Sequence, residues 1–173
     1  MEVLKERKSS RDFSVEKIPS PVLSNLLWAA FGVNRADGRR TAPSSSNRQE
    51  IDIYVAMAEG VYVYEAAPHR LKSALATDIR AKAGTQPFVT QAPVNLIYVA
   101  DYSKMGKSKP EDKAVTAAAD TGFISQNVYL FCASEGLATV VRGSVDREGL
   151  AKAMNLGPDQ RITYAQTVGY PKR

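Results

Sequence analysis

The chain has 173 residues, 44% of them hydrophobic, so its length and composition suit one folded domain covering residues 1–173. Lysine and arginine number 23 and aspartate and glutamate 18, giving a net charge of +5 that is scattered along the chain. This scatter argues against a nucleic-acid-binding module, and the lack of an apolar run of about 18 residues excludes a membrane-spanning helix.

Single cysteine and histidine residues, Cys132 and His69, exclude a disulfide within the chain and a zinc site built from these residue types. Neither a P-loop nor a dinucleotide-binding glycine motif occurs. The first 20 residues are charged throughout and contain no signal peptide. A cytoplasmic protein is therefore the default expectation, with an exported form trimmed before Met1 as the alternative.

Two helices open the chain in the predicted order of elements, over residues 2–8 and 21–31, and the second has apolar residues at a helical period. A polar loop follows over 33–49, and loops of that length within a domain are usually functional or disordered. β-Branched and aromatic residues over 51–57 and 61–64 then predict a β-hairpin.

The second half begins with a mixed segment, 68–91, that predicts one or two short helices, and an apolar run that predicts a central strand over 94–100. The clearest helix covers 111–135, and its length and alanine-rich faces indicate packing across a dimer. The remaining predicted elements are a strand over 137–141, a helix over 146–154 and a strand over 162–168. Helices and strands do not alternate strictly, which favours an α+β fold with a mixed or antiparallel sheet.

Several single residues have ordinary structural interpretations. Cys132 is predicted to be a small buried hydrophobe, His69 a surface or turn residue, and Trp28 a core residue of the second helix. The polar residues inside the long helix, such as Asp120, are typical of capping, bridging or solvent-facing positions.

One candidate binding motif is Arg7-Lys8-Ser9-Ser10-Arg11, at the end of the first helix. The planar guanidinium group of an arginine can donate hydrogen bonds to two phosphate oxygens at once, and serine hydroxyls add neutral donors. A solvated helix end, with cations that complement the helix dipole, explains the same residues without a ligand.

A second candidate is segment 41–49, which is rich in hydroxyl and amide side chains. Such groups can hydrogen-bond the mixed donor and acceptor edge of a heterocycle, but they are equally typical of an ordinary polar connection between elements. A third is Val140-Val141-Arg142-Gly143-Ser144 at the end of a predicted strand. There Gly143 would let a ligand approach the backbone closely; the alternative interpretation is a simple turn into the next helix.

Taken in order, several stretches resemble the nitroreductase-like family of FMN-dependent oxidoreductases, in particular its compact branch that includes thiazoline and oxazoline dehydrogenases. The stretches are ERKSSRDF, TAPSSSNRQ, AADTGFISQNVYLFCASEGLATVVRGS, LAKAMNLGPDQ and QTVGYP. The resemblance implies a three-layer α+β fold with a central mixed or antiparallel sheet flanked by helices. It also implies an intertwined homodimer with an FMN in each of two interface sites.

The activity implied is hydride transfer from NADH or NADPH to the flavin, and then electron transfer to a small-molecule acceptor such as a nitroaromatic or a quinone. Because the flavin carries this chemistry, no catalytic side chain and no metal ligand is assigned. The alternatives are a dehydrogenase of a small heterocyclic or peptide substrate, and a flavin-binding or storage protein without efficient turnover.

The resemblance also implies cofactor-binding residues. Arg7 would pair with the FMN phosphate, Ser9 would bond the phosphate or the ribityl chain, and Arg11 would lie near the pyrimidine edge of the flavin. The backbone at Val141, Arg142 and Gly143 would run along the N5 side. The other residues implied are Lys8, Pro43, Ser44, Ser45, Asn47, Lys172 and Arg173, some of them contributed by the partner subunit.

Three features depart from the family pattern. Glu50 and Ile51 stand where the family commonly has Pro-Trp, the chain stops at Arg173 without the usual tail, and the segment before the central strand is short. These departures affect which substrate the family resemblance implies and how tightly FMN is expected to bind.

Overall fold

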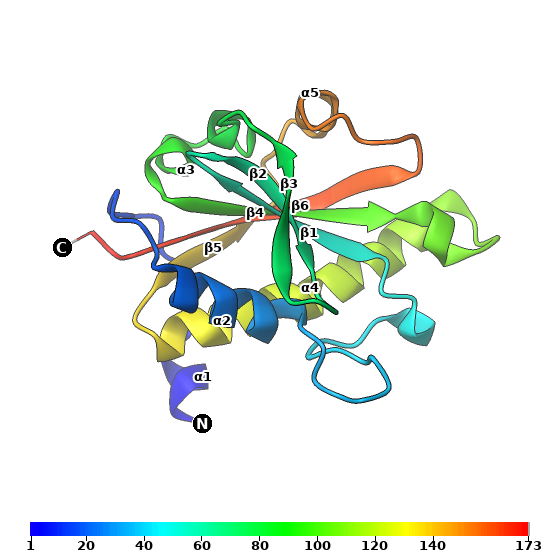
Figure 1. Cartoon of the computed structure of the whole chain (residues 1–173), viewed down its shortest axis with the longest axis horizontal. Helices are drawn as coiled ribbons and strands as arrows, with labels where there is room; N and C mark the ends of the chain where they lie inside the picture. The colour runs from blue at the N-terminus through cyan, green and yellow to red at the C-terminus, as the bar shows by residue number, and fades with distance from the viewer. Residues whose placement is uncertain (173) are drawn as a thin grey trace.

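The computed structural model describes residues 1–172, which form a six-stranded sheet covered by helices on both faces (Figure 1). The sheet has the order β3-β2-β1-β4-β6-β5, and all neighbouring strands are antiparallel. The strands are β1 (Ile51–Met57), β2 (Gly60–Glu65), β3 (Arg70–Leu75), β4 (Val94–Asp101), β5 (Ala138–Arg142) and β6 (Gln160–Gly169). The predicted α+β class, with helices flanking an antiparallel sheet, is confirmed.

The helices form the two outer layers. They are α1 (Glu2–Glu6), α2 (Ser20–Phe31), α3 (Phe88–Gln91), α4 (Pro110–Ser134) and α5 (Arg147–Ala153), with 3-10 turns η1 (Ser45–Asn47), η2 (Arg80–Lys82) and η3 (Tyr102–Met105). α2 and α4 cover one face of the sheet, and α3 and α5 cover the other (Figure 1). None of these helices is long and apolar enough to cross a membrane, within the residues that the structure describes.

β4 lies near the middle of the sheet and supplies both cores. Leu96 and Tyr98 face the core beneath α2 and α4, while Ile97 and Val99 face the core beneath α3 and α5. Side chains alternate along a strand, so a strand covered on both faces has an apolar residue at every position. This explains the continuous apolar run that predicted the strand.

α4 begins at Pro110, which suits the first helical turn, and it has Glu111 and Asp112 there to complement the helix dipole. The prediction of this helix is confirmed. Cys132 near its end is buried, and burial raises the pKa of its thiol to about 12. The prediction of a small buried residue is therefore confirmed.

Two local expectations are wrong. The mixed segment predicted to contain one or two short helices does contain η2 and α3, but it also forms β3, an edge strand paired with β2 that was not predicted, because this pairing overrides a weak local signal. Trp28 is 45% exposed, since it lies beside the buried stripe of α2 that includes Leu23, Leu27 and Ala30. His69, in the turn before β3, has a φ of 48° and is exposed, as predicted for a turn residue.

Candidate cofactor site

An extended N-terminal arm, residues 7–14, runs along the open edge of β5. Ser10 donates its N–H to the carbonyl of Thr139 at 2.9 Å, and Phe13 forms an isolated β-bridge with Pro171. β5 is the last strand of the sheet, so its outward backbone groups are available for these contacts. The arm therefore carries its cations to the sheet edge.

Tyr129 of α4 joins this arm to the strand. Its hydroxyl accepts the Val141 N–H at 3.0 Å and shares a hydrogen bond of 2.8 Å with the Ser9 hydroxyl. The Arg7 guanidinium lies 5.2 Å from the centre of the tyrosine ring. Tyr129 thus brings together residues predicted from two separate motifs, Arg7 and Ser9 from one and Val141 from the other. Sequence reasoning missed Tyr129 because a tyrosine in an apolar helix indicates core.

The cations of the arm are not neutralised by carboxylates. Within residues 1–172, no ion pair involves Arg7, Lys8, Arg11 or Lys172. Lys172 belongs to this group because its backbone N–H reaches the carbonyl of Asp12 at 3.3 Å. Several uncompensated cations at one edge favour an anionic ligand. Arg173, which was also predicted to bind, lies outside the described residues.

A cavity of about 230 Å³ opens between the arm and the end of α4. Its lining includes Lys8, Ser10, Tyr129 and Thr139. Sites for whole ligands usually measure about 300–1,000 Å³, so this hollow suits one polar group of a larger molecule.

The far end of the β5 edge also carries polar groups. Thr139 and Val141 direct backbone groups outward, and alternation along the strand predicts the same for Gly143. Thr85 and Ser144 share a hydrogen bond of 2.8 Å, which ties the segment after η2 to this end. The side-chain oxygen of Gln86 in that segment is buried and meets no donor among the described residues. The Gln86 side-chain oxygen is therefore a further candidate for binding a ligand, which the sequence did not single out.

The Arg142 side chain turns away from this edge. It is 4% exposed and donates to the Ala83 carbonyl at 2.8 Å, to Asn95 Oδ1 at 3.1 Å and to Thr167 Oγ1 at 2.9 Å. Burial lowers its pKa to about 10. The guanidinium therefore fastens the segment after η2 to the sheet, and only the backbone at this position lies at the open edge.

The loop that contains Pro43, Ser44, Ser45 and Asn47 lies elsewhere on α4. Ser45 donates its N–H to Asp120 Oδ2 at 2.9 Å. Asp120 precedes Tyr129 by nine residues, which corresponds to about 13 Å along a helix and two and a half turns. The loop and the arm thus contact α4 at different heights and about half a turn apart around the helix, and one chain does not bring these two predicted groups together.

This loop has a tightly specified backbone. Ser46, Asn47 and Gln49 have φ values of 54°, 52° and 50°, in the left-handed region that costs non-glycine residues energy. Gln49 donates its N–H to Ser44 Oγ at 2.9 Å, and Asn47 donates its N–H to the carbonyl of Ser44 at 2.9 Å. Such strain persists only where surrounding contacts enforce it, and it is common at ligand sites.

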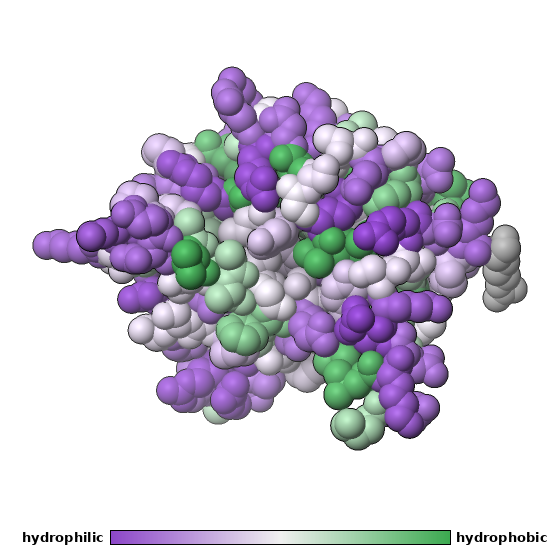
Figure 2. All heavy atoms as spheres, turned by 180° about the vertical axis from the view of Figure 1, so that it is seen from behind, coloured by the Kyte–Doolittle hydropathy of each residue, from purple (hydrophilic) through white to green (hydrophobic). Residues whose placement is uncertain are grey.

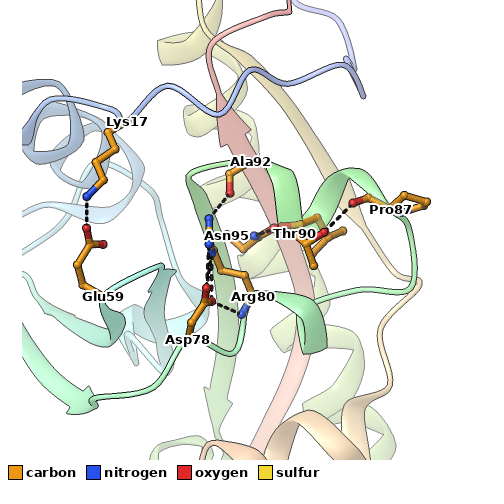
Figure 3. Close-up of polar contacts among 9 residues, drawn as sticks. Lys17, Glu59, Asp78, Arg80, Pro87, Thr90, Ala92 and Asn95 are labelled. Carbon is orange, nitrogen blue, oxygen red and sulfur yellow. Dashed lines mark hydrogen bonds and ion pairs between the residues drawn. The ribbon is translucent and has the colours of Figure 1, made fainter.

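A larger cavity, about 890 Å³, is lined by none of the predicted cofactor residues. It lies between the start of α2, the turn after β1, and the segment before β4. Figure 3 shows two ion pairs that contribute to its wall, Lys17 with Glu59 and Arg80 with Asp78. Arg80 also donates to the carbonyl of Ala92 at 3.1 Å, so its charge is engaged in holding the wall together.

Comparisons with known proteins identify the family and agree with the fold. The model of the nitroreductase family matches residues 4–170. A protein of Methanocaldococcus jannaschii named "Putative nitroreductase MJ1384" is 31% identical over 153 residues, which cover 83% of this chain and 77% of that protein. A Ralstonia eutropha JMP134 structure described as a putative nitroreductase is 42% identical, with a TM-score of 0.95, over 100% of this chain and 83% of that one.

More distant structures share the fold. A chain of the Escherichia coli microcin synthetase McbBCD complex has a TM-score of 0.82 at 19% identity and covers 100% of this chain and 74% of that one. The NADPH:FMN oxidoreductase of Vibrio harveyi, complexed with NAD+, has a TM-score of 0.72 at 20% identity, over 99% of this chain and 68% of that one. The family model spans nearly the whole chain, and the curated relative matches most of it. The chain therefore belongs to the nitroreductase family and is an oxidoreductase of that family.

Proposed function

We propose that this protein is a homodimeric, FMN-dependent oxidoreductase that accepts hydride from NADH or NADPH and reduces a nitroaromatic, quinone or similar small acceptor. The observation that carries the proposal is the cluster of Arg7, Ser9 and Tyr129 at the open edge of β5. Nitroreductase-family proteins generally use FMN with a nicotinamide donor, and membership of the family supports the same cofactor here.

The residues at the β5 edge fit the polar groups of FMN. Arg7, Lys8 and Lys172 offer charges for a phosphate, and the Ser9 hydroxyl offers a neutral donor beside them. The buried Gln86 oxygen lacks a donor and suits an N–H on a heterocycle edge. Bound FMN would supply the two-electron chemistry, while these residues would bind, orient and electrostatically balance it.

A second copy of the chain would complete each site. The loop of Pro43, Ser44, Ser45 and Asn47 meets α4 about 13 Å from Tyr129 and on the opposite side, so the partner's loop is the natural complement to the arm. α4 also exposes apolar surface, with Val115 and Phe123 at 72% and 48% exposure. Figure 2 shows apolar side chains among hydrophilic ones near the middle of one face. Exposed apolar surface of this kind favours self-association.

The function is tested with purified protein loaded with FMN and desalted. We expect the flavin to remain bound and to be bleached by NADH or NADPH without oxygen. We then expect reoxidation by a nitroaromatic compound or a quinone. Flavin that stays oxidised with both nicotinamides would overturn the proposal.

The Arg7→Gln variant tests the phosphate contact. A lost charge-assisted hydrogen bond of about 1.5–3 kcal/mol predicts a dissociation constant for FMN raised by roughly tenfold to a hundredfold. Riboflavin, which lacks the phosphate, should bind wild type and variant equally. Flavin fluorescence quenching measures both, and Arg70→Gln on exposed β3 is the matched control. Equal losses for FMN and riboflavin would contradict the assignment.

The Phe123→Glu variant tests the dimer. A charge on the exposed apolar side of α4 should convert the dimer to a monomer in sedimentation, and should raise the dissociation constant for FMN by tenfold or more, since half of each site is lost. Ser73→Glu on the exposed edge strand β3 serves as the control. A dimeric variant with unchanged FMN binding would refute this arrangement.

A further inference from the structure

Beneath the Ser44–Asn47 loop lies a carboxyl group that neither the family pattern nor the cofactor chemistry accounts for. Glu50, the residue before β1, is 0% exposed. No hydrogen-bond donor reaches either of its carboxyl oxygens within the described part of the chain. A fully buried carboxylate without donors is strongly disfavoured, so this group needs a proton or a partner.

Its partner is Asp120, which is also buried and reaches the loop from α4. Burial, followed by the neighbouring Asp120 carboxyl, raises the pKa of Glu50 to about 7. Two carboxyl groups bond each other only when one of them holds a proton. Asp120 in turn accepts the Ser45 N–H at 2.9 Å, so the pair is linked directly to the loop.

We propose that Glu50 and Asp120 are positioning residues that share one proton and clamp the Ser44–Asn47 loop in the shape that completes the partner's flavin site. This inference rests on the proposed function. The clamp offsets the cost of three left-handed residues, Ser46 and Asn47 in the loop and Gln49 just after it. When the shared proton leaves, two buried carboxylates repel each other, and the anchor of the Ser45 N–H on Asp120 weakens.

Few other charges act on the pair. Arg48, in the loop itself, favours the ionised form of Glu50 to a smaller extent than burial and Asp120 disfavour it. Asp101 at the end of β4 contacts Glu50 through its backbone N–H, which donates to the Glu50 carbonyl at 2.9 Å. The nearby Lys104 is engaged with Asp52 and Asp101. Among residues 1–172, no cation therefore replaces the shared proton.

The decisive variant is Glu50→Gln, because an amide can donate permanently to Asp120 and does not titrate. We expect the dissociation constant of the wild type for FMN to rise at least tenfold between pH 6 and about pH 8.5, and that of the variant to change less than threefold. Asp37→Asn, at an exposed carboxylate of the preceding loop, should follow the wild-type profile. The ionisation of FMN itself is common to all three proteins and cancels in the comparison.

A second measurement does not depend on the cofactor. Hydrogen exchange at the Ser45 amide, corrected for its intrinsic pH dependence, should lose protection in the wild type as pH rises through 7 and stay constant in Glu50→Gln. The clamp would be overturned if the dissociation constant for FMN depended on pH in the same way in the wild type and in Glu50→Gln. It would also be overturned if the Ser45 amide exchanged equally in both proteins at every pH. If neither protein binds FMN at any pH, the proposed function fails, and the exchange experiment still decides whether the clamp exists.

Discussion

Replacing Arg142 by alanine is expected to lower the free energy of unfolding by about 3 kcal/mol, although this residue lies beside the proposed cofactor site. The guanidinium is buried and donates to Ala83, Asn95 and Thr167, on three different segments. Its removal leaves the Ala83 carbonyl without a donor, which costs about 1–3 kcal/mol, and opens a cavity that adds to the loss.

Part of this loss is offset. No ion pair involves the Arg142 charge within residues 1–172, and burial lowers its pKa to about 10, so the native state already bears a desolvation cost that the substitution removes. The packing is nevertheless close, because a Cβ added at Gly84 would lie 1.8 Å from Arg142 Nη1. The lost hydrogen bonds and the cavity therefore outweigh the relief.

Urea unfolding of the Arg142→Ala variant measures the effect. The matched control is Arg70→Ala, whose exposed guanidinium pairs with Glu65 and whose loss should cost no more than about 0.5 kcal/mol. Equal stability of the two variants would contradict a structural role for Arg142. Because the variant is destabilised, loss of flavin from it would not by itself indicate a contact between this side chain and the cofactor.

Most elements of the fold could be predicted because their signals are local. α4 has an acidic first turn after Pro110, and β4 is apolar at every position because both of its faces are covered. β3 could not be predicted in the same way. Its residues are mostly exposed and none is β-branched, so only its pairing with β2 makes it a strand.

The candidate site shows the same division. The cations and hydroxyls of residues 7–11 are contiguous, so their chemistry is visible in the sequence. Tyr129 and Gln86 are isolated in the sequence, and only the fold brings them to the β5 edge. Asp120 is visible as a polar residue in an apolar helix and Glu50 as a departure from the family pattern. Their proximity follows only from the packing of α4 against the loop before β1.

The buried carboxyl of Glu50 should also make the stability of the whole protein depend on pH. Its pKa rises from an ordinary 4.5 to about 7 in the folded chain, chiefly through burial. Between these values the folded state binds more protons than the unfolded state, so the free energy of unfolding falls as pH rises. The stabilising contribution is complete below about pH 4.5 and is lost above about pH 7.

The expected loss is roughly 3 kcal/mol, from about 1.4 kcal/mol for each pKa unit. Urea unfolding between pH 5 and 8 should show it as a decline of the wild type relative to Glu50→Gln, which lacks the titrating group. Other titrating groups are common to both proteins and largely cancel in the difference. A constant difference across this range would mean that Glu50 stays ionised when buried, which its lack of hydrogen-bond donors makes energetically unfavourable.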